Sequence, residues 1–295
     1  MNAPQQSPPR PSAAPEELEV AIVGAGFGGL CMAIRLLAQG ERRFAILEKG
    51  AEVGGTWRDN SYPGAECDVQ SHLYSYSFAG KPDWSQRYAG WQEIQQYILD
   101  TTERFGVRPH IRFNQQVTGL HFDPDTARWR VILASGLELR ARHVVLATGP
   151  LHVPNLPRLP GLERFAGKVF HSAQWDHGYD LAGKRIASIG TGGSAIQYCP
   201  RIAPAAAQLH VFQRTPAWVI PRDVRTYSES TKNRFGRFDV LRRLHRARLY
   251  WTNESRVWPI FHPVLARGLQ RLARWNIRRT VGDASLARKL TPDYT

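Results

Sequence analysis

The 295 residues of the chain are enough for about two domains, and 42% hydrophobic against 22% charged residues excludes a chain that is disordered throughout. No apolar run approaches the roughly 20 residues of a transmembrane helix, and three scattered cysteines without a Cys-x-x-Cys pair or a His/Cys cluster favour a reduced, cytoplasmic protein with neither a disulfide framework nor a metal site. The net charge of +14 is concentrated after Pro221, where 17 of the 39 lysines and arginines stand against 6 of the 25 acidic residues, so it does not by itself indicate a nucleic-acid-binding protein.

The N-terminal part of the chain predicts a leader followed by a β-α-β unit. Residues 1–17, rich in Pro, Gln, Ser and Ala, are expected to form a disordered leader rather than a signal peptide. Leu18–Val23 and Phe44–Leu47 are short apolar runs typical of buried strands, and the spacing in Gly29–Ala38 predicts a helix between them. Because parallel strands need such a crossover, we expect an α/β fold.

The next hundred residues alternate between loop and strand signals. Gly54–Phe78 is dense in Gly, Pro, Ser, Tyr and Asn, and a loop of this length is usually functional. Trp91–Phe105 has helical spacing. Four strands are expected after it, the first three as an inserted β-meander and the fourth as a return to the buried sheet: Val117–Phe122, Arg128–Leu133, Leu137–Arg140 and His143–Ala147.

A second strand–glycine turn–helix unit follows in the C-terminal half. Prolines stiffen residues 151–183 into a linker between domains. Lys184–Ile189 and Gln208–Phe212 are predicted strands on either side of a helix, so the β-α-β pattern occurs twice. Beyond Pro221 the chain is arginine-rich and helical, with breaks near Pro259, Pro263 and Gly282.

The first glycine turn has the spacing G-x-G-x-x-G between a strand and a helix. Gly24 permits the tight turn, Gly26 lets the backbone approach a pyrophosphate, and Gly29 allows close packing of helix on strand. Glu48 closes the second strand, where a carboxylate can accept hydrogen bonds from the ribose hydroxyls of an adenosine. A glycine-rich turn that binds nothing is the alternative.

The second turn has the variant spacing G-x-G-x-x-A and ends differently. Gly190, Gly192, Ser194 and Ala195 form the turn, and Arg214 stands where NAD-binding proteins carry an acid. A cation at this position suits a 2′-phosphate, so we infer NADP rather than NAD; the alternative is an arginine that ends a strand in solvent.

One glycine turn is accompanied by an acidic residue and the other by an arginine, which implies two different nucleotides, FAD at the first turn and NADP(H) at the second. The expected fold is therefore α/β with two Rossmann-like dinucleotide-binding domains, the inserted β-meander and a helical basic C-terminal segment. The domains are predicted as an FAD-binding domain at residues 18–150, the linker at 151–183, and an NADP-binding domain with a helical excursion at 184–295.

A longer pattern between the two turns makes the assignment specific. Phe165, Gly167, His171, Trp175 and Asp176 fit F-x-G-x-x-x-H-x-x-x-W-[P/D], which resembles the fingerprint of the Baeyer–Villiger monooxygenases, the class B flavoprotein monooxygenases. Further segments are similar to that family in the same order: Gly54–Trp57, Tyr62–Ala65, Cys67–Asp68, Ala147–Pro150 and Gln213–Pro216.

The resemblance implies an activity and a set of roles. In the family NADPH reduces FAD, O2 adds at the flavin C4a, and the peroxyflavin converts a small-molecule ketone to an ester or lactone, with sulfide or amine oxygenation as a variant. Asp68 resembles the family's active-site aspartate, where a carboxylate can orient a cation; a turn residue is the alternative. The resemblance also implies FAD contacts by Gly55, Thr56, Trp57, Asp68, Tyr74 and Val117, and NADP contacts by Thr215 with the second turn.

The fingerprint side chains and Trp57 have structural alternatives. His171 and Trp175 are expected to couple NADP binding to domain position rather than to act as acid or base, but a satisfied structural histidine is the competing interpretation. Trp57 is expected to pack near the flavin, with a core tryptophan as its alternative.

Two departures from the family pattern limit what the resemblance implies. Glu66 stands where members often carry an arginine before Cys-Asp, and Leu290–Tyr294 resembles a segment that in the family leads to an active-site arginine. We therefore expect a C-terminally truncated monooxygenase with an exposed sheet edge, reduced stability, and weak or absent oxygenation. The alternatives are an uncoupled NADPH oxidase or reductase and a catalytically silent nucleotide-binding remnant.

The arginine-rich segment has three interpretations. Arginines at positions 242, 243, 246 and 248 alternate with Leu, Tyr and Trp, a pattern that recurs around Trp275. Such a helix can lie on an anionic membrane as a weak peripheral contact, or touch nucleic acid, although no recognition motif accompanies it and no nucleic-acid partner is expected. The plain interpretation is a helical excursion with solvated arginines.

Overall fold

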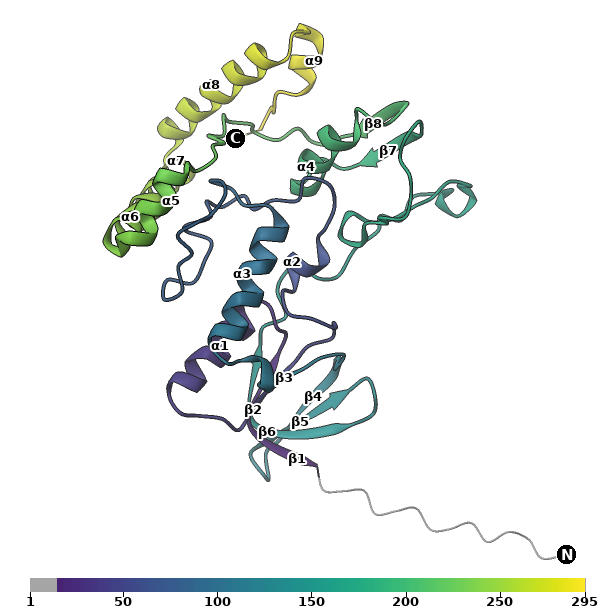
Figure 1. Cartoon of the computed structure of the whole chain (residues 1–295). Helices are drawn as coiled ribbons and strands as arrows, with labels where there is room; N and C mark the ends of the chain where they lie inside the picture. Colours follow the sequence, from purple (N-terminus) through teal and green to yellow (C-terminus); the bar gives the residue numbers. More distant parts are fainter. Residues whose placement is uncertain (1–14, 295) are drawn as a thin grey trace, which may run out of the picture. The chain divides into compact units, whose positions relative to one another are not determined.

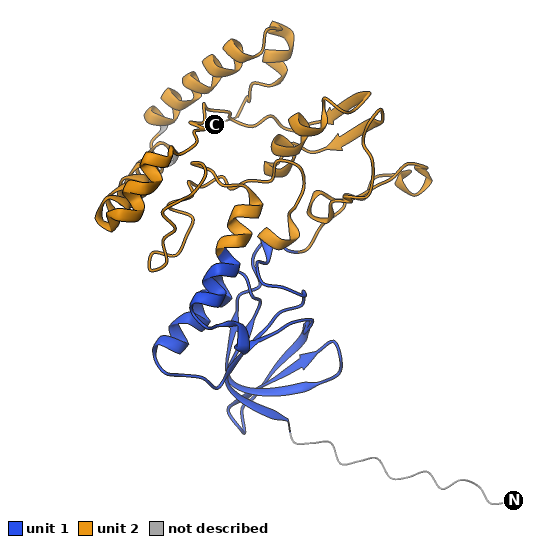
Figure 2. Ribbon diagram, viewed as in Figure 1, with its two compact units in different colours: residues 1–56, 98–152 blue, residues 57–97, 153–295 orange. Residues whose placement is uncertain are grey.

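A computed structural model describes residues 15–294, which divide into two compact units (Figure 2). Unit 1 comprises residues 1–56 and 98–152, and unit 2 comprises residues 57–97 and 153–295. Residues 1–14 of the predicted leader lie outside the described residues. The segment 57–97 thus groups with the C-terminal half, and the domain boundaries inferred from the sequence stay a prediction.

Unit 1 contains a six-stranded mixed sheet in the order β3-β2-β1-β6-β5-β4 (Figure 1). β1 runs parallel to both β2 and β6, with Val20 opposite Phe44 and His143, while β4, β5 and β6 are antiparallel. The parallel half carries the predicted crossover helix α1. The elements are β1 (Glu16–Val23), α1 (Phe27–Ala38), β2 (Phe44–Leu47), β3 (Ile111–Arg112), β4 (Val117–Asp123), β5 (Arg128–Leu133) and β6 (Glu138–Leu146).

The core of unit 1 lies on both faces of this sheet. One face gathers a cluster that includes Leu18, Leu47, Val131 and Leu139, all buried. On the α1 side, a methyl group on Gly29 would stand 3.3 Å from Cγ2 of Ile22, so helix and strand are in close packing. The amphipathic spacing of α1 and the apolar strands therefore produce the layers that the sequence predicts.

The start of β1 corrects the predicted leader. The strand begins at Glu16 rather than at Leu18, so two residues of the predicted leader are in the sheet. The Glu16 carboxylate accepts from the guanidinium of Arg112 at the end of β3, a strand that the sequence did not reveal. This hydrogen bond from Arg112 is the main reason why the pKa of Glu16 lies below its ordinary value. Charged residues at a strand end carry no apolar signal, which explains the misplaced start.

One strand replaces two predicted ones. Leu137–Arg140 and His143–Ala147 were expected as separate strands, but β6 is continuous and pairs with β5 on one side and β1 on the other. Its second half is also not buried as expected, since 67% of Leu146 is exposed. The pairing of β5 with β6 ends at Ala141, so the second half of β6 has a neighbouring strand on one side only. The apolar character of a strand does not by itself show whether another layer covers it.

Unit 2 contains a two-stranded parallel sheet and a run of helices. β7 (Arg185–Ile189) pairs in parallel with β8 (Gln208–Phe212), and α4 (Gly193–Ile202) connects them. The breaks expected near Pro259, Pro263 and Gly282 are confirmed. The later helices are α5 (Glu229–Arg237), α6 (Asp239–Ser255), α7 (Trp258–Phe261), α8 (Pro263–Thr280) and α9 (Ala284–Lys289); α2 (Thr56–Asp59) and α3 (Trp91–Arg104) span the unit boundaries.

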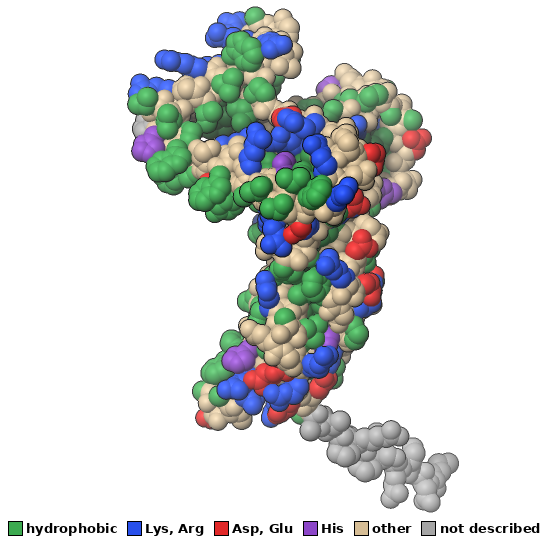
Figure 3. Space-filling view, turned by 60° about the vertical axis from the view of Figure 1, so that its left-hand side comes forward, with side chains coloured by type: hydrophobic (Ala, Val, Ile, Leu, Met, Phe, Trp, Pro, Cys, Tyr) green, Lys and Arg blue, Asp and Glu red, His purple; other side chains and the backbone are tan. Residues whose placement is uncertain are grey.

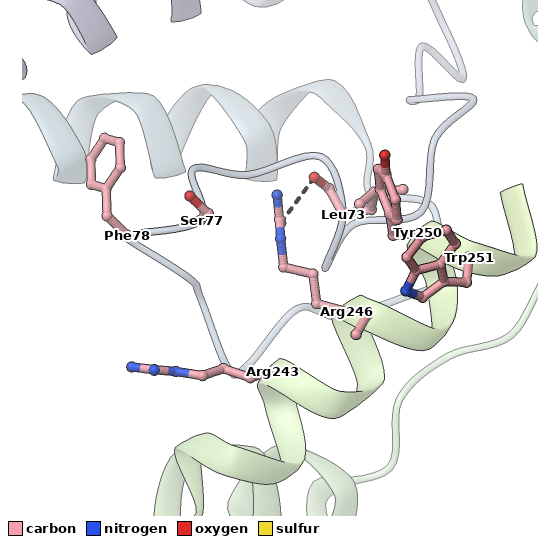
Figure 4. Close-up of a pocket in the computed structure, with 8 residues that line it drawn as sticks. Leu73, Ser77, Phe78, Arg243, Arg246, Tyr250 and Trp251 are labelled. Carbon is pink, nitrogen blue, oxygen red and sulfur yellow. Dashed lines mark hydrogen bonds between the residues drawn. The ribbon is translucent and has the colours of Figure 1, made fainter. Parts of the chain in front are cut away.

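The basic helix α6 is only partly a solvated face. Arg246 points from α6 toward the loop before α3 and donates to the carbonyl oxygen of Leu73 (Figure 4). It also donates to the carbonyl oxygen of His72 and to Oγ of Ser75. By contrast, 69% of Trp251 is exposed, and Figure 3 shows arginine and hydrophobic side chains mixed on the same face of unit 2. The segment thus combines an anchoring arginine with an exposed basic, apolar surface.

Candidate functional site

The first glycine turn has the close contacts that its spacing predicts. Gly24 has φ of +104°, and a methyl group there would stand 2.6 Å from the carbonyl oxygen of Ala147. A methyl group on Gly29 would stand 1.9 Å from the carbonyl oxygen of Gly24. At Gly26, the N-cap of α1, such a group would meet nothing within 4 Å. The turn therefore has open space where a dinucleotide phosphate would approach the helix N-terminus.

Glu48 is fixed at the end of β2 next to this turn. Only 4% of the residue is exposed, and its carboxylate accepts from the N–H groups of Ala25 and Gly50, both at 2.8 Å. The Gly24 N–H donates to the carbonyl of Leu47 and holds the turn against the strand end. A carboxylate oxygen accepts more than one hydrogen bond, so this placement is compatible with the ribose role predicted for Glu48.

A second glycine pair, Gly54 and Gly55, lies beside the first glycine turn. The N–H of Gly54 donates to the carbonyl of Ala25, and Gly55, with φ of +52°, would bring a methyl group to 3.5 Å from Cα of Gly26. Gly55 is thus beside the open position of the turn, and Thr56 begins α2 directly after it. Val117 lies at the start of β4, half-buried against the core cluster.

The second glycine turn repeats the backbone arrangement of the first. Gly190 has φ of +99°, and its N–H donates to the carbonyl of Phe212, as Gly24 does to Leu47. Gly192 is the N-cap of α4, and methyl groups on either glycine would meet nothing within 4 Å. Ala195 is buried in the helix at the position of the third glycine. This turn is likewise open toward the N-terminus of its helix.

Arg214 lies two residues beyond β8 at the same end of the sheet as this turn. It is exposed, and among residues 15–294 its side chain makes no hydrogen bond or ion pair. Thr215 is exposed beside it, while Gln213 donates to Oγ1 of Thr191 within the turn. Arg214 thus lies at the end of β8 where the sequence predicts the contact with a 2′-phosphate, and that contact stays a prediction.

The loop that carries Asp68 lies against α4. Gln197, which is buried on that helix, accepts from the hydroxyl of Tyr62 and donates to the carbonyl of Glu66 and, at 3.4 Å, to the carboxylate of Asp68. Asp68 itself is exposed, and Oδ2 lies 3.7 Å from the position of a methyl group on Gly193. Sequence reasoning did not identify Gln197, because a single glutamine on a helix is not distinguishable from a surface residue.

A cation does lie close to Glu66, the departure from the family pattern. Arg222 donates to the Glu66 carboxylate at 2.6 Å and to the carbonyl of Cys67 at 2.9 Å, and it stacks over the ring of Tyr88. Cys67 is buried, and burial raises the pKa of its thiol to about 11. Arg222 thus anchors the residues that precede Asp68; its partner lies 156 positions away, so no local pattern could reveal the pair.

We expect that reversing both charges of the Arg222–Glu66 pair restores most of the stability that either single reversal removes. Arg222→Glu and Glu66→Arg should each lower the free energy of unfolding by about 1 kcal/mol, because each leaves like charges in contact. The double variant should recover most of that loss, but not the bond to the Cys67 carbonyl. A double-mutant cycle in urea measures the coupling, and strictly additive losses would contradict the ion pair.

Trp57 has the contacts of a core residue in unit 2. Its indole Nε1 donates to the hydroxyl of Tyr74 at 3.1 Å, and the two rings meet edge to face. Only 8% of Trp57 is exposed, and burial raises the pKa of Tyr74. The flavin contacts expected of both side chains stay predictions.

One fingerprint residue, Trp175, packs against α4, and the others make local contacts. Trp175 contacts the ring of Tyr198 on α4, and Tyr198 contacts Tyr62. Nδ1 of His171 accepts from the N–H of Ala173 and so caps a short helical turn, while the coupling role expected of this histidine stays a prediction. The other fingerprint contacts are local: Asp176 pairs with Lys168, and the ring of Phe165 covers Gly167.

Metal sites and membrane spans have no candidates in residues 15–294. No group of three or more His, Cys, Asp or Glu side chains there is arranged to hold a metal ion. In the same residues, no helix has the length and apolar character needed to cross a bilayer.

Comparisons with known proteins agree with this geometry. The sequence model of the family described as "Flavin-binding monooxygenase-like" matches residues 17–261. Two relatives, each named Baeyer–Villiger monooxygenase, are 46% identical (Streptomyces coelicolor) and 47% identical (Pseudomonas aeruginosa), covering 95% and 97% of this chain and 54% of each relative. The chain therefore spans about half the length of the curated relatives that it matches.

Solved structures resemble the same fold. An oxidized steroid monooxygenase bound to NADP matches with a TM-score of 0.83 at 34% identity, over 94% of this chain and 60% of that chain. A closed structure of cyclohexanone monooxygenase matches with a TM-score of 0.83 at 28% identity, over 95% and 60%. These findings confirm the expected α/β dinucleotide-binding fold and the resemblance to the Baeyer–Villiger monooxygenases.

Proposed function

Because the chain belongs to the flavin-binding monooxygenase-like family, we propose that it serves an FAD- and NADPH-dependent oxygenation in which one atom of O2 is inserted into a small-molecule ketone. The product of such a Baeyer–Villiger reaction is an ester or a lactone. The observation that carries the proposal is the pair of open glycine turns, one beside the carboxylate of Glu48 and one at the same end of its sheet as Arg214.

The residues present fit the two cofactors. Gly26 would receive the FAD pyrophosphate at the N-terminus of α1, in a turn made by Gly24 and packed on the strand through Gly29. Glu48 would bind ribose hydroxyls. Gly55 stands beside the same open space. A flavin held there would accept a hydride equivalent from NADPH and supply the electrons that activate O2.

The second turn would hold NADPH. Gly190, Gly192, Ser194 and Ala195 form the turn, and Arg214 and Thr215 would contact the 2′-phosphate. Asp68 lies beside the first turn of α4, where its carboxylate can orient a cation or a polar group of the nicotinamide half. Gln197 holds the carboxylate in this place.

Product analysis tests the proposal directly. The chain is incubated with FAD, NADPH and a cyclic ketone, and lactone and hydrogen peroxide are both measured against NADPH consumed. Lactone formation supports the oxygenase, and peroxide without lactone supports the uncoupled NADPH oxidase. A chain that retains no flavin and consumes no NADPH would be a silent nucleotide-binding protein, which would contradict the proposal. We infer a cytoplasmic location from the cysteine content, and a weak membrane contact through the basic helices stays a prediction.

Arg214 should determine the choice of nicotinamide cofactor. Arg214→Ala is expected to weaken NADPH binding about tenfold to a hundredfold, because a charge-assisted contact to phosphate contributes about 1.5–3 kcal/mol, and to leave NADH binding unchanged. Arg185→Ala is the matched control, since Arg185 is an exposed arginine at the opposite end of the same strand pair. Fluorescence titration with both cofactors checks the prediction; equal losses for NADPH and NADH would refute it.

A further inference from the structure

Gln197 is a buried polar side chain whose whole hydrogen-bonding capacity is used on one loop. Only 8% of the residue is exposed. Its Oε1 accepts from the hydroxyl of Tyr62 at 2.9 Å and from the N–H of Glu66 at 3.3 Å. Its Nε2 donates to the carbonyl of Glu66 at 3.0 Å and to the carboxylate of Asp68 at 3.4 Å. The side chain thus connects α4 to the segment that carries Asp68.

The loop backbone approaches α4 at the same residue. Gly64 has φ of +79°, and a methyl group there would stand 2.9 Å from the carbonyl oxygen of Gln197 and 2.8 Å from Cγ of Arg201. Close approach of backbone to backbone needs a glycine at this point. The loop is therefore held against α4 by main-chain packing at Gly64 as well as by the side-chain amide of Gln197.

The same helix begins at the second glycine turn. Gln197 lies one helical turn beyond Gly193, the first residue of α4. The Asp68 carboxylate oxygen lies 3.7 Å from the position of a methyl group on Gly193. An anionic ligand at the N-terminus of α4 would therefore be a close neighbour of the Asp68 charge, and like charges at short range repel.

We propose that Gln197 is a positioning residue that keeps the Asp68 carboxylate seated on α4 against repulsion by a dinucleotide pyrophosphate bound at the second glycine turn. The inference rests on the proposed function, since it assigns NADP to that turn. Gln197 itself touches neither the turn nor the reacting atoms. Its amide N–H attracts the Asp68 carboxylate and so opposes the repulsion between that carboxylate and the bound pyrophosphate.

Cys67 provides a readout of loop position that does not depend on activity. It adjoins Asp68, only 4% of it is exposed, and its thiol has a raised pKa because of burial. Alkylation by iodoacetamide therefore requires the loop around Cys67 to open. Peptide mass spectrometry separates labelling of Cys67 from that of Cys31 and Cys199.

The experiment compares labelling rates of the full chain with and without NADP+. In the unchanged protein, NADP+ should not accelerate labelling of Cys67. Gln197→Met, which keeps the size but removes all four hydrogen bonds, should raise the rate about tenfold without ligand, and NADP+ should raise it further. Adding Asp68→Asn to this variant should abolish the acceleration by NADP+. Ile196→Ala, at an exposed neighbour on α4, is the matched control and should behave like the unchanged protein.

Each outcome decides a separate point. Equal Cys67 labelling in Gln197→Met and the unchanged protein overturns the positioning role, and acceleration that persists after Asp68→Asn overturns its electrostatic basis. If Gln197→Met does not fold by circular dichroism, Gln197→Glu serves instead, because it keeps the accepted bonds and replaces only the donated ones. Protein fluorescence monitors NADP+ binding in the same samples: absence of binding overturns the NADP assignment, while the ligand-free comparison still tests the positioning of the loop.

Discussion

Replacing Gly29 by alanine is expected to destabilise unit 1 strongly. The added methyl group would stand 1.9 Å from the carbonyl oxygen of Gly24, which is main chain and is held by the contact of Gly24 with β2. Overpacking that forces backbone to shift costs about 1–3 kcal/mol, and occasionally more. We expect a lower midpoint in urea and loss of FAD retention.

Gly26→Ala is the matched control for this prediction. Its methyl group would meet no atom within 4 Å, and its φ of −85° is accessible to any residue, so the free energy of unfolding should stay within about 0.5 kcal/mol. Flavin affinity should nevertheless fall, because the methyl group would occupy the space left for the pyrophosphate. Equal stability losses for the two variants would contradict the assigned roles of the two glycines.

The second large effect is a loss of stability of unit 2 in mild acid. His72 is 3% exposed, Nε2 has no hydrogen-bond partner among the described residues, and burial together with His245, Arg242 and Arg246 lowers its pKa to about 3. A histidine that is neutral in the fold and has an ordinary pKa when unfolded binds more protons in the unfolded state. Its stabilising effect is therefore complete above about pH 6.5 and is lost as the pH falls toward 3.

Between pH 7 and pH 5 this linkage amounts to about 2 kcal/mol. Urea unfolding at several pH values measures it. His72→Phe should remove most of the dependence, since the ring keeps its aromatic contacts with Tyr227 and Phe235 and no longer titrates. His245→Phe is the comparison, because His245 also has a pKa lowered by burial but is only half-buried. A slope unchanged by His72→Phe would show that other groups govern acid unfolding.

Local patterns predicted most of the elements that form the two glycine turns. The strands around Gly24 and Gly190, the helices after them and the breaks after Pro221 follow from apolar spacing and glycine or proline punctuation. The two residues of β3 and the continuity of β6 were missed, because a two-residue strand has no periodicity and charged residues between Leu139 and Val144 interrupt the apolar signal.

The candidate site was predictable only where its chemistry is local. The glycines, Glu48 and Arg214 follow from spacing along one strand or turn. Gln197 and Arg222 are more than 120 positions from the loop that they hold, so only the folded structure reveals them. Glu66 could be recognised as unusual from the family pattern, but its guanidinium partner could not.

The uninterrupted course of β6 sets the order in which the sheet can assemble during synthesis. Its antiparallel neighbour β5, and β4 beyond it, come just before it along the chain, so the β4–β5 and β5–β6 hairpins close through short loops. Its parallel neighbour β1 emerges first, yet position 16 must wait for position 139 to find its partner. A nascent polypeptide that stops before β6 leaves one edge of β1 unpaired. The pairing of β1 with β6 is therefore the last to form in unit 1.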